Sequence, residues 1–432
     1  MDPALLATLR AHNPWLDQPD AQPSLLASLL PSPFVPRRRE MELRPGRAEL
    51  VVGPRQAGKS TWIREVLSHR DEPLLLLAAE EPRVRELASS PALTREALSD
   101  VLQPSTILLI EEVQHLEEAA LFVKGLVDLE PRRRIVVTGS ASFTLAARTR
   151  ESLAGRARRT LLLPFSLEEV EATLPEQLVP AMRDLRRFEL WERLLTTGGY
   201  PDAWLAEEPR SVLHHLVEAF VLKDTSDLHT IERPLVFRKL LELAAADVGN
   251  LANVSEWATV AQASRTAVSR YLAIAEEAHI LRLLPPFAGG LRAEVKGMPK
   301  VYFLDNGLRN AIFGGFAASA GRADKGALWE NAVFNELMKR LSLLDQVFYW
   351  RSKSRAEVDF VVRRQDRLLA IEVKAGELRR PTLSRAARSF LTAYQPACFG
   401  VVNASLSLDT EVGGVNVLFR RPWELGELIA QL

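Results

Sequence analysis

Short apolar runs organise the N-terminal part of the chain. Each run is four to six residues long, and stretches with helical spacing separate them, so the runs predict buried strands that alternate with helices. Such alternation favours a doubly wound parallel sheet, and the predicted fold class is therefore α/β. The five candidate strands are 48–52, 73–78, 106–110, 134–138 and 160–163.

From residue 167 onward the pattern becomes helical. Apolar residues recur at three- and four-residue spacing through 167–245. Residues 254–281 then predict two helices joined by a short turn, with Ser264 as the N-cap of the second. The apolar segments 280–284 and 300–304 follow as strands. This order of elements is typical of a winged helix, a fold that binds DNA in some proteins and serves as a packing or protein-binding module in others.

The first predicted strand leads into a glycine-rich loop that matches the pattern G-x-x-x-x-G-K-[ST]. In such loops the backbone N–H groups surround phosphates, and the following helix adds the positive field of its N-terminus. Lys59 is predicted to reach the β- and γ-phosphates and Ser60 to ligate Mg²⁺, so ATP and Mg²⁺ are the expected cofactors. The predicted binding residues are Gly53, Pro54, Arg55, Gln56, Ala57, Gly58, Lys59, Ser60 and Thr61.

Two acidic residues, Glu111 and Glu112, follow the candidate strand 106–110. They stand at the carboxyl end of a buried parallel strand, where open α/β sheets bind their ligands. Beside a phosphate-binding loop, Glu111 is the expected Mg²⁺ ligand and Glu112 the residue that activates water. The alternative is an acidic start to the next helix.

Two further polar residues are candidates for the same site. The hydroxyl of Ser140, which follows strand 134–138, can orient the attacking water or sense the γ-phosphate; a serine-rich turn is the alternative. Arg156 can reach a nucleotide in a neighbouring subunit and stabilise transition-state charge. A surface arginine is the alternative, since Arg158 and Arg159 lie beside it.

The C-terminal part carries a second group of polar residues. Asp359 lies in one apolar run, and Glu372 and Lys374 lie in the next. The midpoint of positions 359 and 372 is 365.5, inside the intervening turn, so a hairpin places Asp359 opposite Glu372. Alternation then puts Lys374 on the face of Glu372. The opposite face is predicted to be buried and takes Val358, Phe360, Val362, Ile371 and Val373.

Facing carboxylates repel unless a cation lies between them. Glu330, on a predicted upstream helix, supplies a third acid, so Glu330, Asp359 and Glu372 form a candidate metal site, with Lys374 beside it to orient water. The alternatives are an inactive core that keeps a polar face for binding or assembly, and a solvated hairpin face.

The ordered motifs GPRQAGKST, LLIEE, TGSAS, ESLAGR, LPFSLEE and GGYP together resemble the AAA-type (AAA+) P-loop ATPases of bacteria and archaea that carry a C-terminal domain of unassigned function. The resemblance covers most of the chain after about residue 30. It implies an ATPase core followed by a helical lid, and a C-terminal domain similar to the PD-(D/E)xK nuclease core. In that family the acidic pair usually begins with Asp. The longer Glu111 would hold Mg²⁺ or its water differently.

The 432 residues exceed the length of a single small module. The predicted division comprises an N-terminal segment (1–35), the AAA+ core (36–166), a helical lid (167–245), a winged-helix-like segment (246–295) and the nuclease-like domain (296–432).

Composition limits the classes of partner. Lys and Arg together number 55, as do Asp and Glu, which excludes a uniformly basic nucleic-acid binder. The charge is nevertheless segregated: residues 131–160 hold eight arginines against Glu151, and 291–432 hold 21 basic and 15 acidic side chains. DNA contact is therefore expected at local patches. The arginine-rich segment can equally be a subunit interface against the acidic stretch 111–130.

One cysteine, Cys398, cannot form an internal disulfide and is expected as a small buried apolar residue. No apolar run approaches the roughly 18 residues of a membrane span. These features predict a cytoplasmic protein that does not bind a membrane.

The predicted function is Mg²⁺-dependent ATP hydrolysis that drives action on DNA, with branched or single-stranded DNA as a reasonable substrate. A homo-oligomer, for example a hexameric ring, is expected. Outward residues of the second winged-helix helix would enter the major groove, and the nuclease-like site would cut DNA only if it holds a metal. The alternative is a nucleotide-dependent switch that regulates a protein partner, with the C-terminal domain as an inactive platform. The outward residues are Arg265, Thr266, Ser269 and Arg270.

Overall fold

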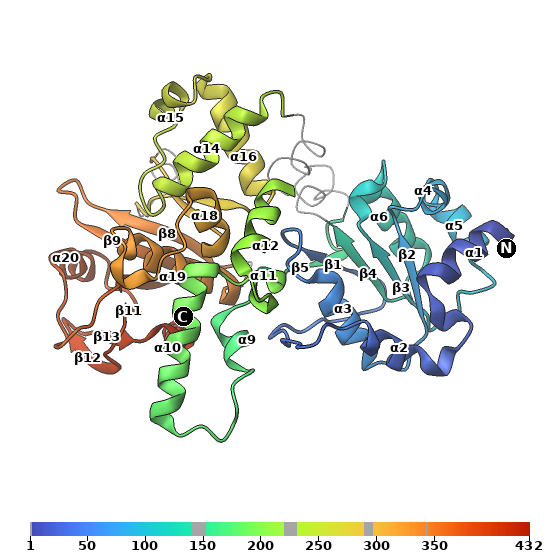
Figure 1. Cartoon of the computed structure of the whole chain (residues 1–432), viewed down its shortest axis with the longest axis horizontal. Helices are drawn as coiled ribbons and strands as arrows, with labels where there is room; N and C mark the ends of the chain where they lie inside the picture. Colours follow the sequence, from blue (N-terminus) through green and yellow to red (C-terminus); the bar gives the residue numbers. More distant parts are fainter. Residues whose placement is uncertain (1, 140–152, 220–230, 289–296, 343) are drawn as a thin grey trace. The chain divides into compact units, whose positions relative to one another are not determined.

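The predicted strands form one parallel sheet in the order β2-β3-β4-β1-β5 (Figure 1). The computed structural model describes residues 2–139, 153–219, 231–288, 297–342 and 344–432. The predicted α/β fold class is confirmed. The strands are β1 (Ala48–Val52), β2 (Leu74–Ala78), β3 (Ile107–Glu111), β4 (Ile135–Gly139) and β5 (Ala157–Leu161).

β5 begins three residues before its predicted start. Arg158 and Arg159 belong to this strand. Two adjacent charged residues are unusual in a buried strand, which is why the prediction began after them. Among the described strands, β5 lies at the edge of the sheet and pairs with β1 alone, so its side chains can reach solvent. Arg158 forms an ion pair of 2.8 Å with Glu42 there.

Helices cover both faces of this sheet. One apolar core gathers side chains such as Leu9, Val84 and Phe122 from α1, α4 and α6, while the core on the other face includes Leu26 and Trp62 from α2 and α3. The helices are α1 (Pro3–His12), α2 (Gln22–Ser28), α3 (Lys59–Ser68), α4 (Pro82–Leu87), α5 (Pro91–Ala97) and α6 (Ala119–Leu129).

The N-terminal segment protects the exposed edge of β2. The Leu76 N–H donates to Asn13 Oδ1 at 2.6 Å, and Asn13 Nδ2 donates to the Leu76 carbonyl at 2.9 Å. The Leu74 N–H likewise donates to Gln22 Oε1 at 2.8 Å. Side chains thus take the place of a neighbouring strand and satisfy polar groups of the edge.

Residues 1–163 form the first of two compact units, and 164–432 form the second. The predicted five-part division is finer than these two units, and its boundaries remain a prediction. Among the described residues, no helix combines the length and apolar character needed to cross a membrane.

The second unit begins with the helices of the predicted lid and winged helix. β6 (Leu281–Leu284) and β7 (Lys300–Phe303) form at the two predicted wing strands, and they pair antiparallel. The side chain of Ser264 accepts from the Ala267 N–H at 3.1 Å, which confirms the predicted N-cap. The helices are α9 (Leu167–Glu171), α10 (Pro180–Thr197), α11 (Pro201–Leu205), α12 (Pro209–Leu216), α14 (Pro234–Ala246), α15 (Val254–Val260) and α16 (Arg265–Glu277).

The predicted lid helices and the winged helix share one apolar core. It contains Leu213 of α12 and Phe237 of α14 together with Trp257 of α15, Leu272 of α16 and Val301 of β7. These segments therefore pack as a single body within the second unit.

A six-stranded mixed sheet completes the second unit, in the order β12-β13-β11-β10-β9-β8. Phe390 of α20 packs with Trp350 on one face, while Leu428 of α21 contacts Gly400 on the other. The elements are β8 (Gln346–Arg351), β9 (Glu357–Arg364), β10 (Arg367–Lys374), β11 (Cys398–Asn403), β12 (Leu408–Val412), β13 (Val415–Arg420), α18 (Asn306–Phe313), α19 (Lys325–Arg340), α20 (Arg385–Tyr394) and α21 (Leu425–Ile429).

The β9–β10 hairpin has the predicted register. Ile371 pairs with Phe360, and Arg367 pairs with Arg364, so the centre falls at 365.5. Val373 was predicted to be buried but is only half-buried. The pairing of β10 with β9 ends at Ile371, so the end of β10 is more open on that side. Cys398 is buried, as expected, and burial raises the pKa of its thiol to about 11.

The cap on β2 yields a stability prediction. Asn13→Ala leaves the Leu76 N–H and carbonyl unpaired and should lower the free energy of unfolding by about 1–3 kcal/mol. Urea unfolding of the full chain measures this change. Gln18→Ala, at an exposed position of the same segment, is the matched control, and an equal loss in both variants would contradict the role of Asn13.

Candidate functional site

The phosphate-binding loop depends on glycines at two strained positions. A Cβ at Gly53 would lie 2.0 Å from the Leu162 carbonyl oxygen, which no side chain can tolerate. Gly58 has a φ of 85° and is the N-cap of α3. These positions let the loop turn tightly from β1 into α3, with the N-terminus of α3 at the loop.

Lys59 is buried at the start of α3 and turns back onto the loop. Its Nζ donates to the carbonyl oxygens of Gly53 at 3.2 Å and Pro54 at 3.0 Å. Burial lowers the pKa of Lys59, and the carboxylate of Glu112 opposes that shift. The structure therefore brings Lys59 of the loop and Glu112 of the acidic pair together.

Glu111 ends β3 beside α3. Its Oε2 lies 3.8 Å from the guanidinium of Arg64, one helical turn after Ser60. Its Oε1 is buried and has no hydrogen-bond partner in the described part of the chain. A buried carboxylate oxygen left open near the first turns of α3 fits a Mg²⁺ ligand, so Glu111 suits that role despite its extra methylene.

Glu112 is held in an uncommon backbone conformation. Its φ of 54° and ψ of 46° are left-handed, which costs a non-glycine residue about 1–2 kcal/mol. The Glu112 N–H donates to Thr138 Oγ1 at 2.9 Å, and Gln114 Nε2 donates to the Glu112 carboxylate. Thr138 of β4 thus holds the backbone of Glu112, and Gln114 holds its carboxylate. Sequence reasoning missed this role, although a threonine at the carboxyl end of a central strand was a signal.

A second residue that sequence reasoning missed supports the loop from outside. Arg37 donates to the carbonyl of Ala57 in the loop, and its guanidinium also donates to the Leu163 carbonyl at 3.0 Å. Arg37 therefore ties the loop to the chain that follows β5. The run of three arginines at 37–39 was its signal in the sequence.

The structure places one of the two other residues predicted for this site. Ser140 lies outside the described residues. Arg156 pairs with Asp128 at 2.6 Å, and hydrogen bonding to that carboxylate raises the pKa of Arg156. Both side chains of this pair are partly exposed. The action of Arg156 on a neighbouring subunit stays a prediction.

The C-terminal acids surround a lysine. Tyr302 OH donates to Glu330 Oε1 at 2.5 Å, and Lys300 Nζ lies 3.1 Å from the same oxygen. Lys300 also forms an ion pair with Glu357. The sequence analysis assigned Lys300 and Tyr302 to a wing strand and gave them no role in the acid cluster. The signal for a buried acidic partner was a charged residue, Lys300, in a short apolar strand.

The electrostatics of this cluster are strong. Burial raises the pKa of Asp359 well above its usual value, and the nearby Glu330 adds to that shift. Burial alone lowers the pKa of Lys300, but the carboxylates of Glu330, Asp359 and Glu357 outweigh it and raise the pKa overall. The ammonium of Lys300 is therefore the positive centre of the acid cluster.

The three predicted metal ligands are not assembled as a metal site. No group of three or more His, Cys, Asp or Glu residues in the described ranges is placed to hold a metal ion. Each predicted ligand instead has a partner within the chain. Glu330 Oε1 accepts from Lys300 and Tyr302. Asp359 Oδ2 accepts the Val373 N–H at 2.7 Å, and Glu372 Oε1 pairs with Lys374 at 2.6 Å. Glu372 Oε2 is buried with no hydrogen-bond partner among the described atoms.

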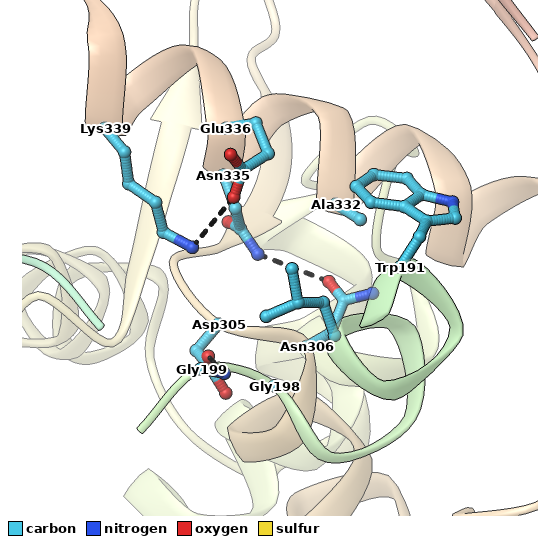
Figure 2. A pocket seen from close by; sticks show the side chains of 10 residues that line it. Trp191, Gly198, Gly199, Asp305, Asn306, Ala332, Asn335, Glu336 and Lys339 are labelled. Atoms are coloured by element: carbon cyan, nitrogen blue, oxygen red, sulfur yellow. Dashed lines mark hydrogen bonds and ion pairs between the residues drawn. The ribbon is translucent and has the colours of Figure 1, made fainter. Parts of the chain in front are cut away.

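A narrow pocket lies where α10, α18 and α19 meet (Figure 2). The Gly199 N–H donates to Asp305 Oδ2 at 2.7 Å, and a Cβ at Gly198 would lie 2.1 Å from Asp305 Oδ1. The Gly-Gly-Tyr-Pro motif is thus shaped around a buried carboxylate.

The other charged groups of this pocket also form hydrogen bonds with backbone groups of the chain. Lys339 Nζ donates to the Phe165 carbonyl at 2.8 Å, and Glu336 Oε2 accepts the Leu167 N–H at 3.1 Å. Lys339 and Glu336 form the ion pair marked in Figure 2, at 3.2 Å. The pocket therefore anchors the Pro-Phe-Ser-Leu motif to α19, and its polar groups have a structural role.

The predicted DNA-reading face of α16 is exposed. Arg265, Thr266, Ser269 and Arg270 all lie on the surface, and Val268 is buried behind them. Arg270 pairs with Glu232 at 3.1 Å.

Three known protein families match successive parts of the chain. Residues 46–171 match the family described as AAA domain, while 188–319 and 325–418 match two families described as domains of unknown function, DUF8612 and DUF4143. The first unit therefore contains an AAA domain of the P-loop NTPases, and a domain with a mixed sheet follows it.

Relatives cover most of the chain. The uncharacterized protein Rv2008c of Mycobacterium tuberculosis is 27% identical over 359 residues, which are 82% of this chain and 75% of that protein. The uncharacterized protein MJ1544 of Methanocaldococcus jannaschii is 23% identical over 337 residues, 75% of this chain and 74% of that protein. A RuvB mutant of Thermotoga maritima is 14% identical, with 55% of this chain and 82% of that chain covered and a TM-score of 0.27.

The support of Glu112 by Thr138 can be tested directly. Thr138→Val removes the hydroxyl that accepts the Glu112 N–H, and the rate of ATP turnover should fall roughly fivefold, equivalent to about 1 kcal/mol. Phosphate release measures the rate, and nucleotide binding should stay unchanged. Thr138→Ser keeps the hydroxyl and should retain full turnover. Equal rates for the valine and serine variants would reject this role.

Proposed function

We propose that this chain hydrolyses ATP with Mg²⁺ and uses the cycle to act on DNA. The observation that carries the ATPase part is the approach of Glu112 to Lys59 of the loop, with Glu111 beside α3. DNA as the target rests on the exposed polar face of α16 and on the local basic patches of a chain with zero net charge.

Each residue of the nucleotide site has a role in this proposal. The backbone N–H groups around Gly58 and the start of α3 hold the phosphates, and Lys59 turns from the loop carbonyls to the β- and γ-phosphates. Ser60 and Glu111 would hold Mg²⁺, which neutralises charge on the phosphate oxygens. Glu112, whose backbone Thr138 holds, positions the attacking water and accepts its proton.

Two features support DNA contact by the winged helix. The outward face of α16 carries two arginines with two hydroxyl side chains, Thr266 and Ser269, and such side chains bind phosphates and base edges. β6 and β7 supply the wing that accompanies such a helix.

A second candidate function is control of a protein partner by the nucleotide state. Two large apolar side chains support it: Leu235 on α14 of the predicted lid is 82% exposed, and Val260 on α15 of the winged helix is 50% exposed. Exposed apolar residues favour protein contacts over contacts with a phosphate backbone.

DNA should stimulate ATP turnover if the first proposal holds. Stimulation by single-stranded and branched DNA should weaken steadily as salt rises, because phosphate contacts release counterions. Arg265→Ala combined with Arg270→Ala should reduce the slope of log affinity against log salt by about one for each phosphate that the arginines no longer neutralise.

Two controls belong to this measurement. Lys59→Ala should lose turnover with and without DNA, and Arg186→Ala, an exposed arginine on α10, should keep the stimulation. If every DNA tested leaves turnover unchanged, the target is not DNA, and the protein-partner function becomes the better account.

The proposed assembly is a homo-oligomer in which Arg156 acts on the nucleotide of a neighbouring subunit. Arg156→Ala and Lys59→Ala should each abolish most turnover alone. Mixed assemblies should regain part of it, because Lys59→Ala subunits supply Arg156 to intact loops of the Arg156→Ala subunits. Phosphate release from mixtures at several ratios measures the recovery. Turnover that stays at the level of the separate variants at every ratio would reject action in trans.

A further inference from the structure

A single strand connects the winged helix to the acid cluster. Side chains of β7 alternate between two sides, as in any strand. Val301 and Phe303 enter the core of the winged helix, whereas Lys300 and Tyr302 contact Glu330 of α19. The wing therefore inserts a cation and a phenol among the acids of the nuclease-like domain.

Lys300 occupies the centre of these acids. Only 3% of the surface of Lys300 is exposed, and its Nζ pairs with both Glu330 and Glu357. Arg351 lies 3.7 Å from Glu357, and Lys374 lies 2.6 Å from Glu372. Glu330, Glu357 and Glu372 thus each have a cation of this chain as a partner.

One carboxylate oxygen each of Glu330 and Asp359 is already committed to partners in the chain. A divalent ion such as Mg²⁺ requires oxygen ligands at about 2.0–2.1 Å. Glu330 Oε1 already accepts from Lys300 and Tyr302, and Asp359 Oδ2 accepts from Val373. An ion ligated by Glu330 and Asp359 would have to displace a buried ammonium, which would then lack its partners.

We infer that Lys300 is a built-in counter-ion that takes the place of the divalent metal of a nuclease core. The C-terminal domain is then a metal-independent module that does not cut DNA, and the polar face of its sheet is held rigid by ion pairs. Removal of the Lys300 charge should convert the acids into a metal site, because Glu330, Glu357 and Asp359 would be left to attract a cation.

Binding of Mn²⁺ to the full chain without nucleotide tests this inference. Isothermal titration should find no Mn²⁺ site in the wild-type chain that depends on Asp359. Lys300→Met should gain one, and this site should bind Mn²⁺ at least about tenfold more tightly than any residual Mn²⁺ binding by the wild-type chain, or about 1.4 kcal/mol. The added site should disappear when Asp359→Asn is combined with Lys300→Met.

Two controls separate the charge from the position. Lys300→Arg keeps a cation and should gain no site, and Lys353→Met removes an exposed lysine of the same domain and should also gain none. Thermal unfolding gives a second readout: Mn²⁺ should raise the Tm of Lys300→Met but leave that of the wild type unchanged.

The wild-type chain keeps the inference falsifiable even if Lys300→Met does not fold. Wild-type protein should leave labelled linear, single-stranded and branched DNA intact in Mn²⁺. Cutting that Asp359→Ala and Glu372→Ala abolish would overturn the inference, as would wild-type Mn²⁺ binding that Asp359→Asn removes. A folded Lys300→Met that binds no additional Mn²⁺ would overturn it as well.

Discussion

The second unit depends on one buried carboxylate, that of Asp305. It accepts the Leu308 N–H at 2.9 Å and so caps α18, and it accepts the Gly199 N–H at the end of α10. The cost of burying this charge, which raises the pKa of Asp305, is offset by these backbone hydrogen bonds. Close approach explains the glycines: a Cβ at Gly307 would lie 2.1 Å from the Thr197 carbonyl oxygen. α10 and α18 are thereby fixed against each other.

Asp305 follows β7 by two residues, so the same joint also sets the position of Lys300 and Tyr302. The joint extends through Asn306, whose Nδ2 donates to the Leu328 carbonyl of α19 at 3.0 Å. The helix that carries Glu330 is therefore fixed to the strand that carries its cation. The Phe303 N–H also donates to Asn331 Oδ1 of α19 at 2.8 Å. Because these hydrogen bonds hold the wing strand to α19, the ion pairs of the acid cluster form between rigid elements and lose little side-chain entropy.

The sequence was most informative where the chemistry is local. The glycines of the loop, the acids that end β3 and the symmetric spacing of Asp359 and Glu372 all lie within a few residues of the turn that positions them, so the five-stranded sheet and the hairpin register could be predicted. The partners of Glu330 could not, because Lys300 reaches it through the tertiary packing of a strand with a helix. Arg158 and Arg159 obscured the start of β5, since an edge strand tolerates charges that a central strand excludes.

Two buried lysines, Lys59 and Lys300, show how the local environment decides whether a lysine binds a ligand or has a structural role. Lys59 bonds to loop carbonyls, and burial lowers its pKa because nearby charge does not fully compensate the lost water. An arriving phosphate supplies the missing negative charge, so Lys59 gains from a ligand. Lys300 has two carboxylates as direct partners, and their charge raises its pKa despite burial. Since a further ligand would add nothing that Lys300 lacks, the first lysine suits binding and the second suits the role of a permanent counter-ion.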